Sequence, residues 1–340
     1  MSIVGGLDVH RAQITYDYLD VDTGEVEAGR IVPATRLVLR DWLARFDGLE
    51  AGFATEGCTG WRFVVEELRR AGVEAHLAEP ADTATLRGRK RRAKTDRADA
   101  RHLRQLLSQD RLPESWIAPS HVLEVRTKGR LYVTLRDQRR AWQQRIHAQL
   151  FHQGVEKRRN LLAAEQRAWL LEADLSDAGR QPIEVALRVT DSLDTEIEPL
   201  RAELGGLARR LPGPRALRQG IWGIGPLTAP IIWAEMGDTR RFSSSDQAVR
   251  HTGLDVTVWD SDGKRSPGHL SRQGPPVLRW ALFEAAFLAA KKISPDHDYY
   301  LSVKERLGAN RAALSVARKL ARRVHHILRQ LGDQAWQEAA

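Results

Sequence analysis

Four acidic residues have the types and the spacing to hold a divalent metal ion. Asp8 and Glu56 each stand at the end of an apolar, strand-like run, whereas Asp96 and Asp99 follow a basic stretch and are three residues apart. A spacing of three places two side chains on one face of a helix. Four converging carboxylates need a compensating cation, and a hard ion such as Mg²⁺ or Mn²⁺ takes oxygen ligands. Two ions held in this way form a common arrangement for cutting phosphodiesters.

The elements that must position these acids follow from the apolar pattern of the N-terminal part. Strand-like runs cover residues 3–9, 12–19, 26–32, 51–55 and 74–78, and helical spacing covers residues 34–46 and 60–71. The predicted order is three strands followed by a helix, a strand, a helix and a strand. This order resembles that of the RNase H-like and RuvC-like nucleases. That order places Asp8 on the central strand and Glu56 at the end of the strand beside it, where ligand sites form in such folds.

The composition indicates a polyanionic partner. The 340 residues include 53 Lys and Arg against 44 Asp and Glu, which gives a net charge of +9 and a pI near 10. Such a balance is typical of nucleic-acid-binding proteins, although solvated positive surface is the alternative. The single cysteine, Cys58, excludes a disulfide within the chain and a zinc site built from cysteines. No apolar run is long enough to span a membrane, so we expect a cytoplasmic protein.

Basic residues gather directly before Asp96 and Asp99. Residues 85–94 contain six of them, which would hold a phosphate backbone over the metal site unless the segment is only a solvated loop. The six are Arg87, Arg89, Lys90, Arg91, Arg92 and Lys94. A basic helix expected over residues 311–330 is a second candidate for DNA or RNA contact.

Residues 120–210 carry apolar residues at heptad-like spacing, which predicts a coiled-coil hairpin or a subunit interface. An ordinary helical bundle within one subunit is the alternative. The first interpretation implies a homo-oligomer, either a dimer or a tetramer. The two apolar series are Leu131, Leu135, Trp142, Ile146, Leu150 and Leu193, Ile197, Leu200, Leu204, Leu207, and the residues that punctuate the region are Pro182, Gly205, Gly206, Pro212 and Pro214.

The C-terminal third opens on a glycine-rich turn. Gly223 and Gly225 precede a helix start that includes Thr228, a pattern similar to a helix-hairpin-helix turn. The glycines of such a turn let backbone N–H groups approach a phosphate, although Gly-x-Gly also serves plain turns. These three residues are therefore candidate nucleic-acid contacts.

Taken together, the motifs resemble the DEDD insertion-sequence transposases, which are related to the Piv and MooV DNA invertases and include the bridge-RNA-guided recombinases. The resemblance covers nearly the whole chain. It implies an N-terminal RuvC-like α/β domain (1–110), a helical coiled-coil spacer (111–212) and a mainly helical transposase domain (213–340) with a nucleophilic serine. It rests on Gly6-Leu7-Asp8, Thr55–Gly60, Lys94–Ala100, Gly223–Ala229, Arg241-Phe242, Gly253-Leu254, the serine near Ser261, Ser271–Gly274 and Leu278-Arg279.

Counting from Gly253-Leu254, the serine of the family falls on Ser261. Two departures leave the register open: Val256 stands where the family usually has proline, and Asp262 follows the serine where the family usually has glycine. The fallback candidates for the nucleophile are Ser266, Ser271 and residues 243–245. Further candidate nucleic-acid contacts in this region are Lys264, Arg265 and Arg272.

The resemblance implies a site-specific DNA recombinase or transposase of an insertion sequence, guided by a noncoding RNA that pairs with donor and target DNA. Ser261 would form a covalent phosphoserine link, and the metal at Asp8, Glu56, Asp96 and Asp99 would polarise the scissile phosphate. One alternative is a metal-dependent nuclease of the Holliday-junction type without serine chemistry. Another is a nucleic-acid-binding protein with a degenerate nuclease fold.

Overall fold

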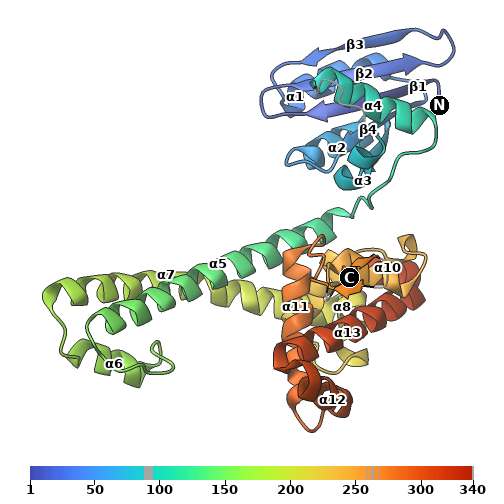
Figure 1. Ribbon diagram of the computed structural model, residues 1–340. Coiled ribbons are helices and arrows are strands. Elements are labelled where there is room, and N and C mark those ends of the chain that lie inside the picture. Colours follow the sequence, from blue (N-terminus) through green and yellow to red (C-terminus); the bar gives the residue numbers. More distant parts are fainter. Residues whose placement is uncertain (88–94, 258, 262–263, 267, 339–340) are drawn as a thin grey trace. The chain divides into compact units, whose positions relative to one another are not determined.

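The computed structural model describes residues 1–87, 95–257, 259–261, 264–266 and 268–338 (Figure 1). The side chains of residues 171, 259–261 and 264–266 lie outside this description. The chain divides into two compact units, Met1–Ile117 and Ala118–Ala340. The finer division into three domains at residues 110 and 212 remains a prediction. None of the described helices combines the length and the apolar character that crossing a membrane requires.

The first unit is built on a five-stranded mixed sheet in the order β3-β2-β1-β4-β5. β1 and β2 are antiparallel, as are β2 and β3, whereas β1, β4 and β5 run parallel. The predicted order of elements is confirmed and is consistent with an RNase H-like fold. The strands are β1 (Ile3–Val9), β2 (Ile14–Asp20), β3 (Val26–Ile31), β4 (Ala51–Glu56) and β5 (Glu74–Ala78), and the helices are α1 (Arg36–Leu43), α2 (Trp61–Arg70), α3 (Pro80–Thr85) and α4 (Asp96–Ser108).

The largest differences between predicted and observed boundaries in the first unit concern two elements. β2 begins at Ile14, because residues 10–13 form the turn that leads out of β1. The helix predicted over residues 34–46 is α1 followed by a short 3-10 helix, Ala44–Phe46. Thr35 caps α1 by accepting a hydrogen bond from the backbone N–H of Val38, which fixes where the helix begins.

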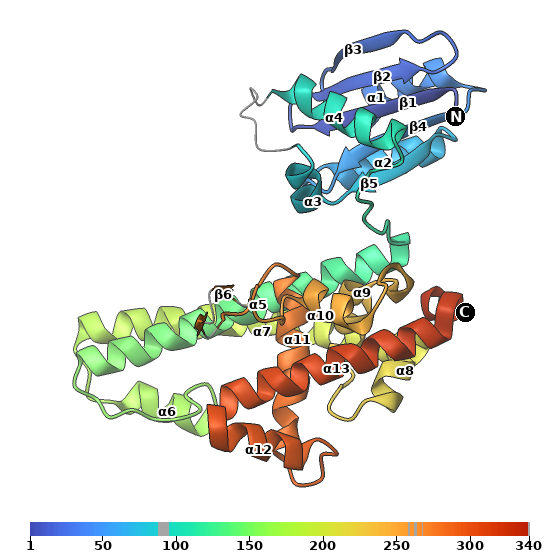
Figure 2. The same ribbon diagram turned by 45° about the vertical axis from the view of Figure 1, so that its right-hand side comes forward.

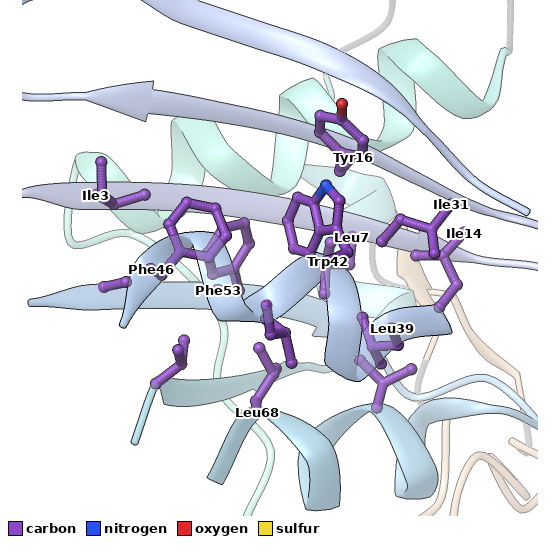
Figure 3. Close-up of a cluster of buried hydrophobic side chains, with 14 residues drawn as sticks. Ile3, Leu7, Ile14, Tyr16, Ile31, Leu39, Trp42, Phe46, Phe53 and Leu68 are labelled. Atoms are coloured by element: carbon purple, nitrogen blue, oxygen red, sulfur yellow. The ribbon is translucent and has the colours of Figure 1, made fainter. Parts of the chain in front are cut away.

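The apolar core of this unit lies on the face of the sheet that α1 and α2 cover. Leu7 of β1 and Phe53 of β4 are completely buried there against Leu39 of α1 and Leu68 of α2. Figure 3 shows this cluster, with α4 on the opposite side of the strands. Because side chains alternate along a strand, Asp8 and Glu56 point to the α4 side. A smaller apolar group of Ala54, Ala78 and Leu103 joins α4 to that second face.

The second unit contains two long helices that lie side by side in both views (Figures 1 and 2). They are α5 (Ser120–His152) and α7 (Asp177–Arg210), connected through α6 (Ala164–Glu172). Ile146 and Leu150 of α5 pack with Ile183 of α7 in a buried cluster, so part of the heptad pattern is satisfied within one chain. Association between chains therefore remains a prediction.

The prediction that Pro182, Gly205 and Gly206 interrupt the helical region is wrong. α7 runs from Asp177 to Arg210 through Pro182, Pro199 and both glycines. The apolar contacts of α7 with α5 stabilise the helix against the weak intrinsic preference of these residues, as tertiary packing often does. Pro212 does begin a new helix, at the first position, where proline is well tolerated.

The rest of the second unit is mainly helical and centres on α9. Every residue of α9 (Thr228–Met236) is buried, so this helix has no solvent face. The indole of Trp233 donates a hydrogen bond to the carbonyl of Ala335 (2.9 Å). The other elements are α8 (Pro212–Gly220), α10 (Ser245–Thr252), the strands β6 (Trp259–Ser261) and β7 (Lys264–Ser266), α11 (Pro276–Phe287), α12 (His297–Leu307) and α13 (Ala309–Leu331), with short 3-10 helices at Thr239–Arg241, Leu288–Ala290 and Gly332–Trp336.

Candidate functional site

Asp8 and Glu56 are brought together by the pairing of β1 with β4. The parallel register pairs Leu7 with Thr55, so Asp8 and Glu56 occupy the next position on each strand. Both side chains are partly exposed, with 18% and 32% of their surface accessible. The sheet therefore supplies two carboxylates at one edge, as the sequence predicts.

Gly6 allows α4 to approach this edge closely. A Cβ atom at Gly6 would stand 2.1 Å from the carbonyl oxygen of Ala100 and 2.7 Å from the backbone nitrogen of Arg104. Both are backbone atoms of α4 and cannot move aside without displacing the helix. The absence of a side chain at Gly6 thus permits α4 to lie directly on β1, next to Asp8.

The N-terminus of α4 carries the other two acids. Thr95 caps the helix by accepting from the N–H of Ala98 (3.2 Å), which places Asp96 and Asp99 in the first turn. Acidic side chains are favoured there by the helix dipole. A buried ion pair also fixes α4, since Arg104 donates to the fully buried Asp17 of β2 (2.5 Å).

Asp8, His10 and Asp96 form a group whose ligand atoms all lie within 4.8 Å of one another. The Nε2 atom of His10 is 3.1 Å from Asp8 Oδ2 and 3.5 Å from Asp96 Oδ1. Burial raises the pKa of the Asp8 carboxyl above its usual value, and the charges of Asp99 and Asp96 add to this effect while His10 opposes it. The raised pKa of Asp8 thus reflects burial first, and the neighbouring carboxylates contribute less.

Arg87 joins the two remaining acids. Its guanidinium contacts Asp99 Oδ1 (2.5 Å) and lies 3.8 Å from Glu56 Oε1. The sequence predicts a phosphate contact for Arg87, whereas the structure places its cation on two of the four acids. The other predicted contacts of this stretch, Arg89, Lys90, Arg91, Arg92 and Lys94, lie outside the described residues.

The donor set fits a hard divalent cation. Four carboxylates from β1, β4 and α4 offer oxygen atoms of the kind that Mg²⁺ and Mn²⁺ prefer, and His10 adds a nitrogen that Mn²⁺ tolerates better than Mg²⁺ does. The Arg87 guanidinium is a cation that lies against two of the same carboxylates. A bound metal ion must therefore compete with Arg87.

Removal of the Arg87 charge is expected to strengthen metal binding. In Arg87→Met the apolar stem is kept but the cation beside Asp99 and Glu56 is lost, so the Mn²⁺ dissociation constant should fall by about tenfold, equivalent to about 1.4 kcal/mol. Titration of free Mn²⁺ by electron paramagnetic resonance measures this directly. Arg69→Met on the exposed surface of α2 is the control, and equal affinities for all three proteins would contradict the competition.

Sequence reasoning missed four residues of this site. From the sequence, His10 beside Asp8 either touches substrate or lies on plain surface, and Gln13, Asp17 and Arg104 are not singled out. Gln13 donates to Asp96 Oδ2 (3.0 Å), and both it and His10 belong to the turn between β1 and β2. The available signal is the polar turn directly after Asp8, since residues of a turn at the same sheet edge must lie close to the acids.

The predicted serine lies on a small hairpin in the second unit. β6 and β7 are antiparallel, and Ser261 pairs with Lys264. The backbone places Ser261 at the end of β6, but the side chains of Ser261, Lys264 and Arg265 lie outside the described residues, as does that of Ser266.

The base of this hairpin is formed by motifs far apart in the sequence. A Cβ at Gly253 would meet the backbone nitrogens of Gly274 (2.8 Å) and Gln273 (2.9 Å), so the two chain segments pass in close contact. Gly253 also has a φ of +66° as the C-cap of α10. Arg279 donates to the carbonyl oxygens of Thr252 and Gly274 and ties the segments together.

Two fallback serines have local partners. The hydroxyl of Ser271 donates a short hydrogen bond to Asp255, and Ser244 caps α10 by accepting from Gln247 N–H (3.3 Å). Arg272 is exposed beside this base, with a φ of +55°, and its N–H donates to the carbonyl of Gly253 (3.2 Å).

The glycine-rich turn before α9 is held by internal hydrogen bonds. Gly223 has a φ of +93°, and a Cβ there would lie 2.7 Å from the carbonyl of Ala285, so glycine is required for close packing on α11. The N–H of Gly225 donates to the hydroxyl of Thr228 (3.0 Å). One of the N–H groups considered for phosphate binding is therefore already engaged.

Many basic residues of α13 are also engaged within the chain. Arg323 and Lys319 pair with the buried Asp296, and Arg322 pairs with Asp246. Arg318 donates to the carbonyl of Leu254 (2.8 Å), at the base of the hairpin. Through these ion pairs, basic side chains of α13 hold α10 and the start of α12 in place.

Comparison with known proteins relates two segments of the chain to transposases. A transposase model of the IS110 DEDD type matches residues 5–152, which include Asp8, Glu56, Asp96 and Asp99. The model of the transposase IS116/IS110/IS902 family matches residues 216–301, which include Ser261. Both matched segments are thus similar to those of IS110-type transposases.

Two curated relatives are similar to the chain as well. The chain is 29% identical over 244 residues to "Putative transposase y4rJ" of Sinorhizobium fredii, a match that covers 65% of this chain and 61% of the relative. It is 27% identical over 140 residues to "Probable family 20 transposase" of Pseudomonas aeruginosa, covering 38% of this chain and 41% of the relative. The chain therefore spans less than two thirds of the length of either relative.

Proposed function

We propose that this protein is a site-specific DNA transposase of an insertion sequence, which cuts and rejoins DNA strands with the help of a divalent metal ion. The observation that carries the proposal is the convergence of Asp8 and Asp96, with Asp99 and Glu56 joined through Arg87, at one edge of the sheet. The match of both segments to transposase models supports the same reaction class.

The residues would divide the chemistry between them. Asp8, Glu56, Asp96 and Asp99 hold the metal, which when bound supplies positive charge at the scissile phosphate. In the proposed reaction, the Ser261 oxygen attacks phosphorus, one phosphorus–oxygen bond of the DNA breaks, and the serine proton ends on the departing sugar oxygen. The phosphoserine link conserves the bond energy, so the reverse attack by a sugar hydroxyl rejoins a strand.

Two partners complete the proposal. A guide RNA encoded beside the gene would pair with donor and target DNA, so that the protein reads backbone and shape. Assembly of a dimer or tetramer through the α5–α7 region would bring a first unit and a second unit from different chains to one DNA site. The family resemblance supports both partners.

Ser261→Ala tests the serine chemistry. The full chain, purified with RNA transcribed from its own flanking DNA, is incubated with duplexes that carry the ends of the element, and protein–DNA adducts are separated under denaturing conditions. We expect adducts with the wild type and at least a hundredfold fewer with Ser261→Ala, because the nucleophile is removed. Ser271→Ala is the matched variant, and loss of the adduct only in that variant would move the nucleophile to Ser271.

The DEDD acids alone fit a structure-specific junction nuclease equally well. In that case Ser261→Ala and Ser271→Ala would both cut at the wild-type rate, without any covalent adduct, whereas Asp8→Asn would be inactive. The same set of reactions thus separates the two functions.

A further inference from the structure

The junction of α7 and α8 carries a concentrated positive charge that no acid balances in the described part of the chain. Between Glu203 and Glu235 the sequence has four arginines and no acidic residue. All four arginines are exposed, and no ion pair with a carboxylate is found for them among the described residues. The four are Arg209, Arg210, Arg215 and Arg218.

Three of these arginines border one hollow. Arg209 at the end of α7 and Arg215 and Arg218 of α8 line a depression of about 410 Å³, together with Ala208 and Gln219. Arg215 and Arg218 are three residues apart and so lie on one face of α8. Arg210 instead extends along α7 toward Gly206, where its Nη2 atom is 3.8 Å from the position that a Cβ would take.

Packing accounts for the other face of α8 but not for this cluster. Leu217 is buried, and Gly220 lies against Ile327 of α13, so α8 is fixed from the inner side. Basic residues in the last turn of a helix are favoured by its dipole, which explains Arg209 or Arg218 singly. Three guanidinium groups around one hollow repel one another unless an anion joins them.

We propose that Arg209, Arg215 and Arg218 form a binding surface for the phosphodiester backbone of a nucleic-acid duplex. A guanidinium presents parallel N–H donors that match phosphate oxygens in a bidentate manner. Such contacts position the backbone and read no base sequence. The surface adjoins the turn before α9, where the Gly225 N–H is engaged by Thr228, so the arginines rather than that N–H supply the phosphate contacts. This inference rests on the proposed function and names the surface of the second unit that contacts the nucleic-acid backbone.

The test is equilibrium binding in the absence of metal. The full chain with EDTA is titrated against labelled DNA and RNA duplexes of one length and unrelated sequence, between about 50 and 200 mM salt. For Arg209→Gln/Arg215→Gln/Arg218→Gln we expect at least tenfold weaker binding at the lowest salt. The slope of log affinity against log salt should fall by about two to three, close to one for each lost phosphate contact.

The control variant removes the same charge elsewhere on the second unit. Lys292→Gln/Lys304→Gln/Arg306→Gln changes exposed residues on and beside α12, where Asp298 and Glu305 make the surface mixed in charge. For this control variant, the slope of log affinity against log salt should stay within about one of the wild-type slope. Equal losses in both triple variants, or an unchanged slope in the α7–α8 variant, would overturn the binding surface. Thermal unfolding of each variant shows that the fold is retained.

The two kinds of duplex identify the source of the phosphates. A larger loss on DNA assigns the surface to the donor or target, and a larger loss on RNA assigns it to a structured guide; either supports the surface. A wild-type chain that binds no duplex would overturn both this inference and the proposed function. Arginine-dependent binding without any Asp8-dependent cleavage would support the surface and contradict the proposed function alone.

Discussion

Asp8→Asn should lower the rate of DNA strand cleavage by about a thousandfold or more, equivalent to about 4 kcal/mol of transition-state stabilisation. Asp8 stands on the central strand, within reach of His10 and Asp96, and asparagine keeps its size while removing the charge proposed to hold a metal. Single-turnover cleavage of an element-end duplex at saturating Mg²⁺ measures the loss. Asp41→Asn, an exposed acid of α1, is the control and should cleave like the wild type.

Although Asp8→Asn should lose cleavage activity, we expect it to be at least as stable as the wild type. The raised pKa of Asp8 means that, between the unfolded and folded pKa values, the folded chain holds more protons than the unfolded chain. The free energy of unfolding of the metal-free protein therefore falls as pH rises through that window, and ionised Asp8 destabilises the fold at neutral pH. Asp8→Asn should unfold at the wild-type temperature or above it, so an inactive variant that is also unstable would contradict this account.

Gly6→Ala should separate α4 from β1 and disable the site without touching any acid. The added methyl group would meet backbone atoms of Ala100 and Arg104 well inside contact distance. Overpacking of this kind costs about 2–3 kcal/mol, and the shift of α4 carries Asp96 and Asp99 away from Asp8. We expect a lower melting temperature and at least a tenfold weaker affinity for Mn²⁺, measured by electron paramagnetic resonance.

Gly57→Ala is the matched control for Gly6→Ala. Its Cβ would meet its nearest neighbour, Pro80 Cδ, at 3.6 Å, which is an ordinary contact. This variant should bind Mn²⁺ as the wild type does. Wild-type metal affinity in Gly6→Ala would show that the contact between α4 and β1 does not position the acids.

The sheet and the acidic site were predictable because both depend on local patterns. Successive side chains of a strand point to opposite faces, so Asp8 and Glu56 had to lie on the side opposite to Leu7 and Phe53. The spacing of Asp96 and Asp99 in the first turn of a helix fixes their common direction. The pairing of β1 with β4 and the approach of α4 to Gly6, in contrast, join residues far apart in the sequence and do not follow from these patterns.

The contacts of His10 and Arg87 could not be read from spacing. Arg87 is twelve residues before Asp99 and is separated from Glu56 by two helices and a strand, so its position depends on how α3 ends and not on any period. In the second unit the course of α7 through Pro182 and Pro199 is set by packing on α5, against intrinsic preference. The pairing of Gly253 with Gly274 likewise depends on tertiary approach and has no periodic signal.

The central claim is that the four acids hold a divalent metal at the edge of the sheet. Anomalous diffraction from crystals of the full chain grown with Mn²⁺ locates that metal directly. We predict a strong anomalous peak bounded by Asp8, Glu56, Asp96 and Asp99, with the Arg87 guanidinium displaced from Asp99. The absence of a peak there, with Arg87 still bound to Asp99 at saturating Mn²⁺, would contradict the account.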